Sequence, residues 1–328
     1  MLDHGGGVRL AARQFAIPPE EWLDLSTGIN PMGWVPPAIP RHCWARLPEE
    51  EDGLEEGARH YYRTPFLLPM PGSTAAIQLL PRLRPCSRVV VLSPTYSEHA
   101  HAWEVTGHAL ERLSLDELEP IVERFDVVVV VNPNNPTGTL LSPEHLLSWQ
   151  GRLQHRGGWL VVDEAFMDAT PADSLASKVG PPGLIVLRSM GKFFGLAGAR
   201  VGFLLAENGL LLQMQELLGP WSVAGASRWL AAQALADLPW QAWARRQLPV
   251  AADRLRELLD HFGWQPRGGT LLFQWVVTTE DGHVWDALAR QGILVRHFPE
   301  MGALRFGLPG EESEWARLEA GLAALRRP

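Results

Sequence analysis

Lys192 is the residue in this sequence that is best placed to do covalent chemistry. It follows the apolar run of residues 184–187 and lies in a stretch rich in glycine and alanine, which favours a loop over a helix. Phe193 and Phe194 follow it and give the amine apolar surroundings. Such surroundings disfavour the charged form and leave a nucleophile able to form a Schiff base. A lone lysine is more often a solvated surface residue, so other residues must support this interpretation.

Two further apolar runs end in residues that suit contact with an aromatic ligand. RVVVL at residues 88–92 is followed by Tyr96, one of three tyrosines, whose ring can stack on such a ligand. DVVVVV at residues 126–131 ends in NPNNPTG, where two prolines and a glycine hold Asn135 in a rigid turn. Either residue alone is also compatible with a purely structural role.

Asp163 ends a fourth apolar run, WLVVD. Burying a carboxylate at the end of a strand costs free energy unless a cation pairs with it, so we expect a partner for Asp163. His99 and His101 lie near Tyr96, but their spacing on a helix points them apart, and we do not interpret them as metal ligands.

The alternation of these runs with helical stretches predicts an α/β fold with a mostly parallel sheet. The carboxyl ends of parallel strands lie along one edge, where ligands bind. Tyr96, Asn135, Asp163 and Lys192 are therefore expected to converge there. This convergence favours a reactive lysine over a surface lysine.

Glycine-rich segments elsewhere suggest contacts with an anion. Gly72, Ser73 and Thr74 precede an apolar helical run, and the free N–H groups at such a helix start suit a phosphate, although an ordinary cap is equally compatible. His4 is followed by three glycines, and the later residues Ser26, Asn30 and Pro31 favour an ordered arm over an active site. A flexible terminus is the alternative.

Composition excludes several function classes. The 328 residues carry a net charge of -8 with a pI near 5.8, so no basic field is available to hold nucleic acid or an anionic membrane. Cys43 and Cys86 are too few for a disulfide framework and too unpaired for a zinc site, and we expect no metal and a reducing cytoplasm. The N-terminus carries no apolar signal core, and no stretch is apolar enough to span a bilayer.

The chain order predicts three parts. Residues 1–45 are expected to form the N-terminal arm over the active site, and residues 46–225 the large domain with the mostly parallel sheet. Residues 226–328 contain long helices followed by short strands and are expected to form a smaller α+β domain.

The motifs NPNNPTG, DEAF and SMGK, with an arginine eight residues after Lys192, together resemble the fold type I pyridoxal-5'-phosphate enzymes of the class I and II aminotransferase superfamily. Within it, the N-terminal HGG, the INP of residues 29–31, Phe166 in DEAF and PWS at residues 220–222 look most like the L-threonine-O-3-phosphate decarboxylases of cobalamin biosynthesis. Histidinol-phosphate aminotransferases are the next most similar family.

The resemblance implies pyridoxal 5'-phosphate as cofactor and a role for each matching residue. Lys192 would hold the cofactor covalently, Asp163 would pair with its ring nitrogen, Asn135 would bond its phenolic oxygen, and Tyr96 would stack on its ring. The implied catalytic residues are Lys192, Asp163 and Tyr96. The implied contacts to the cofactor phosphate are Gly72, Ser73, Thr74, Ser189 and Arg200. The implied substrate-binding residues are His4, Gly5, Gly6, Asn30, Asn135, Arg296 and Arg305.

Four positions depart from the superfamily pattern. Phe166 stands where aminotransferases usually have tyrosine, although the decarboxylases share this phenylalanine. Leu47 replaces a tyrosine that usually reaches the cofactor phosphate across a dimer interface. Gly191 replaces a serine or threonine, and Gly269-Thr270 replaces an Asn-Tyr pair. The resemblance therefore implies weaker anchoring of the cofactor phosphate.

The activity that the resemblance implies is decarboxylation of L-threonine O-3-phosphate to (R)-1-amino-2-propanol O-2-phosphate by a homodimer. Two alternatives stay open: a histidinol-phosphate-type aminotransferase using the same residues, and a non-catalytic ligand-binding protein on the same fold. Carbon dioxide release separates the first alternative, and the absorption of the bound cofactor separates the second.

Overall fold

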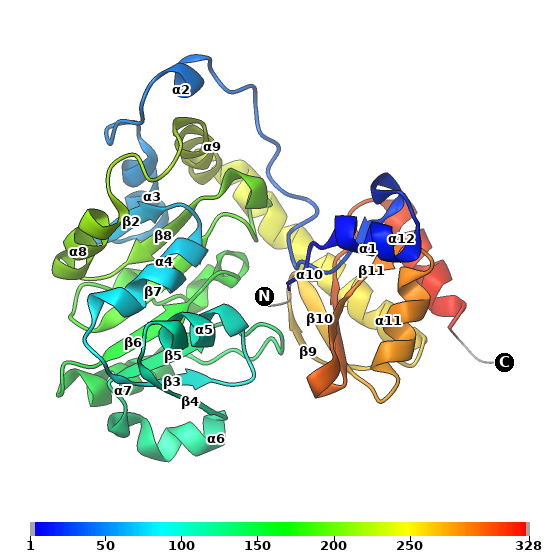
Figure 1. Ribbon diagram of the computed structural model, residues 1–328. Helices are drawn as coiled ribbons and strands as arrows, with labels where there is room; N and C mark the ends of the chain where they lie inside the picture. The colour runs from blue at the N-terminus through cyan, green and yellow to red at the C-terminus, as the bar shows by residue number, and fades with distance from the viewer. Residues whose placement is uncertain (1–3, 326–328) are drawn as a thin grey trace. The chain divides into compact units, whose positions relative to one another are not determined.

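The computed structural model describes residues 4–325, which divide into two units (Figure 1). Unit 1 comprises the described residues up to Gly33, the short segment Pro136–Gly138 and the described residues from Trp243 onward. Unit 2 comprises Trp34–Asn135 and Thr139–Ala242. Each unit is described by itself below.

Unit 2 is built on a seven-stranded sheet with the order β2-β8-β7-β6-β5-β3-β4. Its strands are β2 (Leu67–Met70), β3 (Arg88–Leu92), β4 (Ala109–Leu113), β5 (Val127–Val131), β6 (Trp159–Asp163), β7 (Leu184–Ser189) and β8 (Gly202–Leu205). Strands β4, β3, β5, β6 and β7 pair in parallel, whereas β8 is antiparallel to β7 and to β2. The predicted mostly parallel sheet is therefore present.

The sequence forms these strands because they are buried on both faces. All five valines of β5 are buried, as expected for a central strand of a parallel sheet. The helices of unit 2 are α2 (His42–Ala45), α3 (Leu54–Tyr62), α4 (Ser73–Leu79), α5 (Ser97–Val105), α6 (Leu115–Leu118), α7 (Pro143–Gln154), α8 (Asn208–Leu218) and α9 (Gly225–Ala236). Apolar side chains from α4, α5 and α8 join those of the sheet in one core.

Unit 1 contains a four-stranded antiparallel sheet with the order β12-β13-β10-β9 and a parallel pair, β1-β11. Their bounds are β1 (Leu23–Asp24), β9 (Pro266–Thr270), β10 (Phe273–Val277), β11 (Ile293–Leu294), β12 (Arg296–Phe298) and β13 (Ala303–Gly307). Its helices are α1 (Val8–Phe15), α11 (Asp281–Ala289) and α12 (Glu312–Ala323). The predicted α+β character of the C-terminal region is therefore present.

Short 3-10 helices connect many of these elements. They are η1 (Pro19–Glu21), η2 (Leu80–Leu83), η3 (Glu119–Arg124), η4 (Met167–Ala169), η5 (Pro171–Asp173), η6 (Ala176–Lys178), η7 (Ala197–Ala199) and η8 (Pro299–Met301). No helix among residues 4–325 is both long and apolar enough to cross a membrane.

The units differ from the predicted division at residues 45/46 and 225/226. The N-terminal residues belong to unit 1 because β1 pairs with β11, and the Leu25 amide donates to the carbonyl oxygen of Leu294 at 2.8 Å. The other division falls inside helix α10 (Leu238–His261), between Ala242 and Trp243. A division inside one continuous helix leaves no break in composition for a sequence to display.

Candidate active site

Unit 2 brings the predicted strand-end residues together at one edge of its sheet. Tyr96 follows β3 and is the cap residue of helix α5, while Asp163 and Ser189 are the last residues of β6 and β7. Strand β5, which lies between β3 and β6, runs into the loop that carries Asn135. Because these four strands are parallel neighbours, their carboxyl ends form a single polar edge.

Asp163 is buried, with both carboxylate oxygens engaged. Oδ2 lies 2.9 Å from Nε2 of His99, and Oδ1 accepts a hydrogen bond from the amide of Ala165 at 3.0 Å. His99 lies on the first turn of α5 and contacts the ring of Tyr96 edge-on, with 6.3 Å between ring centroids. The expected partner of Asp163 is therefore His99.

His99 is a site residue that the sequence interpretation missed, because it weighed this histidine only as a metal ligand. The available signal was its position three residues after Tyr96, which places both on one side of a helix start. Among residues 4–325, no group of three or more His, Cys, Asp or Glu side chains could hold a metal ion.

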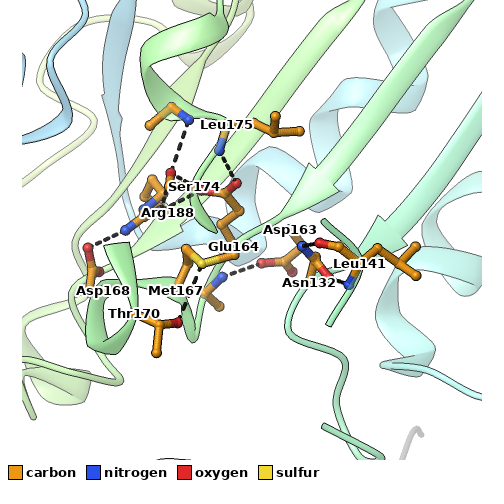
Figure 2. Close-up of polar contacts among 12 residues, drawn as sticks. Asn132, Leu141, Asp163, Glu164, Met167, Asp168, Thr170, Ser174, Leu175 and Arg188 are labelled. Atoms are coloured by element: carbon orange, nitrogen blue, oxygen red, sulfur yellow. Dashed lines mark hydrogen bonds and ion pairs between the residues drawn. The ribbon is translucent and has the colours of Figure 1, made fainter. Parts of the chain in front are cut away.

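The NPNNPTG loop is held by its own asparagines. Asn132 exchanges two hydrogen bonds with the backbone of Leu141, at 2.8 and 3.0 Å (Figure 2). Asn134 donates to the carbonyl oxygen of Pro94 at 2.8 Å and accepts from the hydroxyl of Thr95 at 2.6 Å. These bonds join the loop after β5 to the loop after β3, so the half-buried Asn135 is carried on a fixed turn.

Lys192 has an aromatic neighbour from outside its own loop. Its Nζ lies 5.2 Å from the ring centroid of Phe166, whereas Phe193 and Phe194 are fully buried and pack on Trp240. The two phenylalanines therefore anchor the lysine loop, and Phe166 faces the amine. A phenylalanine in the DEAF motif leaves this ring without the hydroxyl that a tyrosine would present there.

The predicted phosphate contacts surround the start of helix α4. Gly72 has a φ of +79°, and a Cβ built on it would lie 2.6 Å from Nη2 of Arg200. A Cβ on Gly202 would lie 2.5 Å from the amide nitrogen of Ser73. The backbone that precedes Thr74 therefore packs directly against β8 and the guanidinium. Arg200 itself has a φ of +53°, an uncommon conformation for a bulky residue that is typical of functional sites.

Two departures from the superfamily pattern have structural explanations here. A Cβ on Gly191 would lie 3.2 Å from Cα of Ala197, which is a tight contact, and the Gly191 amide donates to Oγ of Ser189 at 3.3 Å. Glycine therefore relieves crowding beside Ser189. Leu47 is exposed, with 61% of its surface accessible, and contributes no polar group.

A buried ionic network lies beside the ends of strands β6 and β7 (Figure 2). Arg188 forms ion pairs with Glu164 and Asp168, and all three side chains are essentially inaccessible. Glu164 also accepts hydrogen bonds from the hydroxyl of Ser174 at 2.5 Å and the amide of Leu175 at 2.7 Å. Since Glu164 follows Asp163 and Arg188 precedes Ser189, the network fixes the ends of β6 and β7 from the opposite face.

Burial sets the electrostatics of this network. Burial raises the pKa of Glu164, and the neighbouring guanidinium of Arg188 opposes that rise. Burial lowers the pKa of Arg188, but Asp168 and Glu164 outweigh it and keep this pKa above its ordinary value. Arg188 is therefore a permanent cation that holds two carboxylates in the core.

Unit 1 carries the predicted substrate-binding residues other than Asn135. Arg296 on β12 is directly opposite Arg305 on β13. Arg305 is 4% exposed, donates from Nη2 to the carbonyl oxygen of Ser26 at 2.5 Å, and lies 5.1 Å from the ring centroid of Phe273. Two arginines therefore face each other at one register position of the paired strands, and we call this pair the arginine row.

The N-terminal glycines lie near the same residues of unit 1. Gly6 donates from its amide to Oγ of Ser26 at 2.7 Å, and a Cβ on Gly5 would lie 2.3 Å from the carbonyl oxygen of Ser26. His4 is exposed, and the buried Asn30 accepts from the amide of Met32 at 2.9 Å in a local turn. The segment is thus attached to β1 and Arg305.

The glycine that replaces an asparagine in β9 also has a structural reason. Gly269 has a φ of +154°, and a Cβ on it would lie 2.5 Å from the carbonyl oxygen of Phe273. A Cβ on Gly138 would in turn lie 2.1 Å from the carbonyl oxygen of Gly269. The end of the NPNNPTG segment therefore packs backbone to backbone on β9, and only glycines fit there.

Comparison with known proteins agrees with this geometry. Residues 53–323 match the model of the aminotransferase class I and II family. The chain belongs to this family. It is 54% identical to the threonine-phosphate decarboxylase of Pseudomonas aeruginosa, covering 100% of this chain and 99% of that protein. It is 41% identical to that of Sinorhizobium sp, covering 99% and 98%.

A solved structure shows the same fold. The histidinol-phosphate aminotransferase from Sinorhizobium meliloti in complex with pyridoxal-5'-phosphate matches with a TM-score of 0.81 at 19% identity, covering 98% of this chain and 95% of that one. The predicted fold class, fold type I with a smaller α+β part, is confirmed.

Proposed function

We propose that this chain is a pyridoxal-phosphate-dependent threonine-phosphate decarboxylase. It converts L-threonine O-3-phosphate to (R)-1-amino-2-propanol O-2-phosphate and carbon dioxide, a step of cobalamin biosynthesis. The 54% identity over the full chain to an enzyme of that name carries the proposal. The activity that the sequence motifs implied is therefore retained.

The donor set of unit 2 fits the cofactor. Lys192 supplies the amine that binds it, and Asp163, fixed by His99 and Ala165, supplies the carboxylate for its ring nitrogen. Tyr96 would stack on its ring, and Asn135 would bond its phenolic oxygen. The cofactor phosphate is assigned to Gly72, Ser73, Thr74, Ser189 and Arg200. When bound, the cofactor supplies an acceptor for the electron pair released at the substrate Cα.

The anionic groups of the substrate are assigned to unit 1. Arg296 and Arg305 bind the anionic groups of threonine phosphate, because guanidinium groups match phosphate and carboxylate oxygens in bidentate geometry. The residues assigned to the substrate phosphate also include His4, Gly5, Gly6 and Asn30, and together they form the phosphate grip. Firm binding of the phosphate would fix the orientation of the substrate and so select which bond at Cα breaks.

The chain's own groups then complete the reaction. The bond from Cα to the carboxylate breaks, carbon dioxide leaves, and the electron pair remains with Cα. The amine of Lys192 would deliver a proton to Cα. The apolar ring of Phe166 lies beside the amine that would hold this proton.

The products test the proposal against transamination. Purified protein incubated with threonine phosphate is expected to release carbon dioxide and an amine phosphate in equal amounts without 2-oxoglutarate. A histidinol-phosphate-type aminotransferase would break the Cα–H bond and form a keto product only with 2-oxoglutarate. Amino transfer without gas contradicts the proposal, and a protein that shows no cofactor absorption band is a non-catalytic ligand-binding protein.

We also propose a homodimer in the cytoplasm. Seven large apolar side chains of unit 2 are more than half exposed: Val35, Trp44, Leu47, Val105, Leu212, Trp221 and Leu238. Large exposed apolar side chains are typical of protein interfaces. Light scattering on the purified protein is expected to give twice the 36.4 kDa chain mass. The compartment is in line with Cys43 and Cys86, which are both free cysteines.

A further inference from the structure

Ser26 lies at the centre of four hydrogen bonds in unit 1. Its amide and its hydroxyl both donate to Oδ1 of Asp24, at 2.9 and 2.6 Å. Its hydroxyl oxygen accepts from the amide of Gly6 at 2.7 Å, and its carbonyl oxygen accepts from Nη2 of Arg305 at 2.5 Å. One buried residue therefore contacts both the N-terminal glycines and an arginine of the substrate end.

The hydroxyl of Ser26 can make this connection in only one arrangement. A hydroxyl has one proton to donate, and Asp24 takes it because a carboxylate only accepts. The lone pairs of the oxygen are then left to accept from Gly6. Asp24 thus sets the rotation of the hydroxyl, and the hydroxyl sets the position of the arm.

The backbone on both sides holds the carbonyl of Ser26 in place. The preceding residue, Leu25, donates to Leu294 at 2.8 Å and accepts from the amide of Gly307 at 2.7 Å. Leu25 is thereby fixed between β11 and the end of β13, the strand that carries Arg305. The carbonyl that orients Arg305 cannot shift without breaking these strand contacts.

The glycine arm lies against the same carbonyl. A Cβ on Gly5 would lie 2.3 Å from this oxygen, far inside any real contact, so the backbone of the arm packs directly on it. The carbonyl of Ser26 therefore meets Gly5 from one direction and the guanidinium of Arg305 from another. The ring of Phe273 further restricts the guanidinium plane.

We propose that Ser26 is a positioning residue for the substrate phosphate. Its hydroxyl holds the His4–Gly6 arm, and its carbonyl sets the plane of the Arg305 guanidinium, so that one residue aligns both parts of the phosphate grip. The inference rests on the proposed function, since it assigns these groups to the phosphate of threonine phosphate. Bidentate recognition depends on that plane, and loss of alignment weakens phosphate binding more than turnover.

Binding of inorganic phosphate to the holoenzyme tests the alignment without turnover. By calorimetry, Ser26→Ala is expected to weaken phosphate binding about 10-fold, the loss expected for one hydrogen bond to a positioned group. Ser26→Thr, which keeps the hydroxyl, and Ser148→Ala, which removes an exposed serine hydroxyl on α7, are expected to bind phosphate as the wild type does. Unchanged phosphate affinity in Ser26→Ala overturns the inference.

Kinetics then separate alignment from a general structural role. Ser26→Ala is expected to raise KM for threonine phosphate about 10-fold with kcat within about 2-fold, which is the pattern of lost uniform binding. Gly5→Ala, which displaces the arm from the same carbonyl, should shift KM in the same direction. A fall in kcat alone overturns the inference. A wild type that releases no carbon dioxide refutes the proposed function, while the phosphate titration still decides the role of Ser26.

Discussion

Two regions of the molecule differ in the charges that they bring together. One is the set of strand ends in unit 2 that is assigned to the cofactor, here called the cofactor edge, and the other is the arginine row of unit 1. Asp163 is buried, and both of its carboxylate oxygens form hydrogen bonds within unit 2. The ion pair of Arg188 with Glu164 fixes the adjacent strand ends. Arg296 and Arg305 instead stand opposite each other as like charges on paired strands. The first region pairs a carboxylate with groups of its own unit, whereas the second gathers two cations on neighbouring strands.

Replacing Lys192 by alanine removes the reactive group of the cofactor edge. We expect carbon dioxide release to fall by about 10⁴-fold, the upper range for a group that transfers a proton in the reaction, with loss of the cofactor absorption band. Of the 29 lysine and arginine residues, only Lys178 and Lys192 are lysines. Lys178→Ala, on an exposed 3-10 helix, is the matched control and should retain full activity.

The Arg188→Met variant removes the cation of the buried network beside the cofactor edge. It leaves Glu164 and Asp168 buried without their cation, and we expect the free energy of unfolding to fall by about 3–5 kcal/mol. Urea denaturation measures this change. Burial raises the pKa of Glu164 in the folded state, so protonation favours folding, and the variant should recover stability as the pH is lowered from 7 to 5. A stability that falls further in acid contradicts this account.

At the arginine row, Arg305→Lys keeps one charge and loses the planar fork. We expect KM for threonine phosphate to rise about 10- to 100-fold, since a charged hydrogen bond contributes about 1.5–3 kcal/mol. The cofactor absorption band should not change, because Arg305 belongs to unit 1. Equal weakening of cofactor and substrate binding would remove the distinction between the two regions.

The smallest effect is expected at His99. Replacing it by phenylalanine leaves Oδ2 of Asp163 without its partner, and the affinity for pyridoxal phosphate should fall about 10-fold, whereas His99→Gln, which can still donate, should restore most of it. Titration of apo-protein with the cofactor measures both. Equal affinities in the two variants would show that the hydrogen bond does not orient Asp163.

The two regions also differ in how far the sequence predicts them. The apolar runs of β3, β5 and β6 are continuous, so their ends, and with them Tyr96, Asn135 and Asp163, could be placed from sequence. Strands β4 and β8 were not predicted: β4 is an exposed edge strand, ALERL, and β8 is a short run after a glycine-rich loop. Neither sequence shows a hydrophobic periodicity that marks it as a strand.

Long-range contacts account for what the sequence could not predict. The pairing of β1 with β11 joins residues 23–24 to residues 293–294, and no local pattern signals it. The link from Ser26 to Arg305 depends on that pairing, as does the membership of the arm in unit 1. The contact of Phe166 with the Lys192 amine likewise joins two separate loops, and no local pattern signals it.

Borohydride reduction of the holoenzyme, followed by peptide mapping, tests the central claim most directly. Reduction fixes the cofactor to the amine that holds it, and the chain offers only two lysine side chains. We predict a single pyridoxyl label on the peptide that contains Lys192. A label on Lys178, or no label on either lysine, would contradict the account.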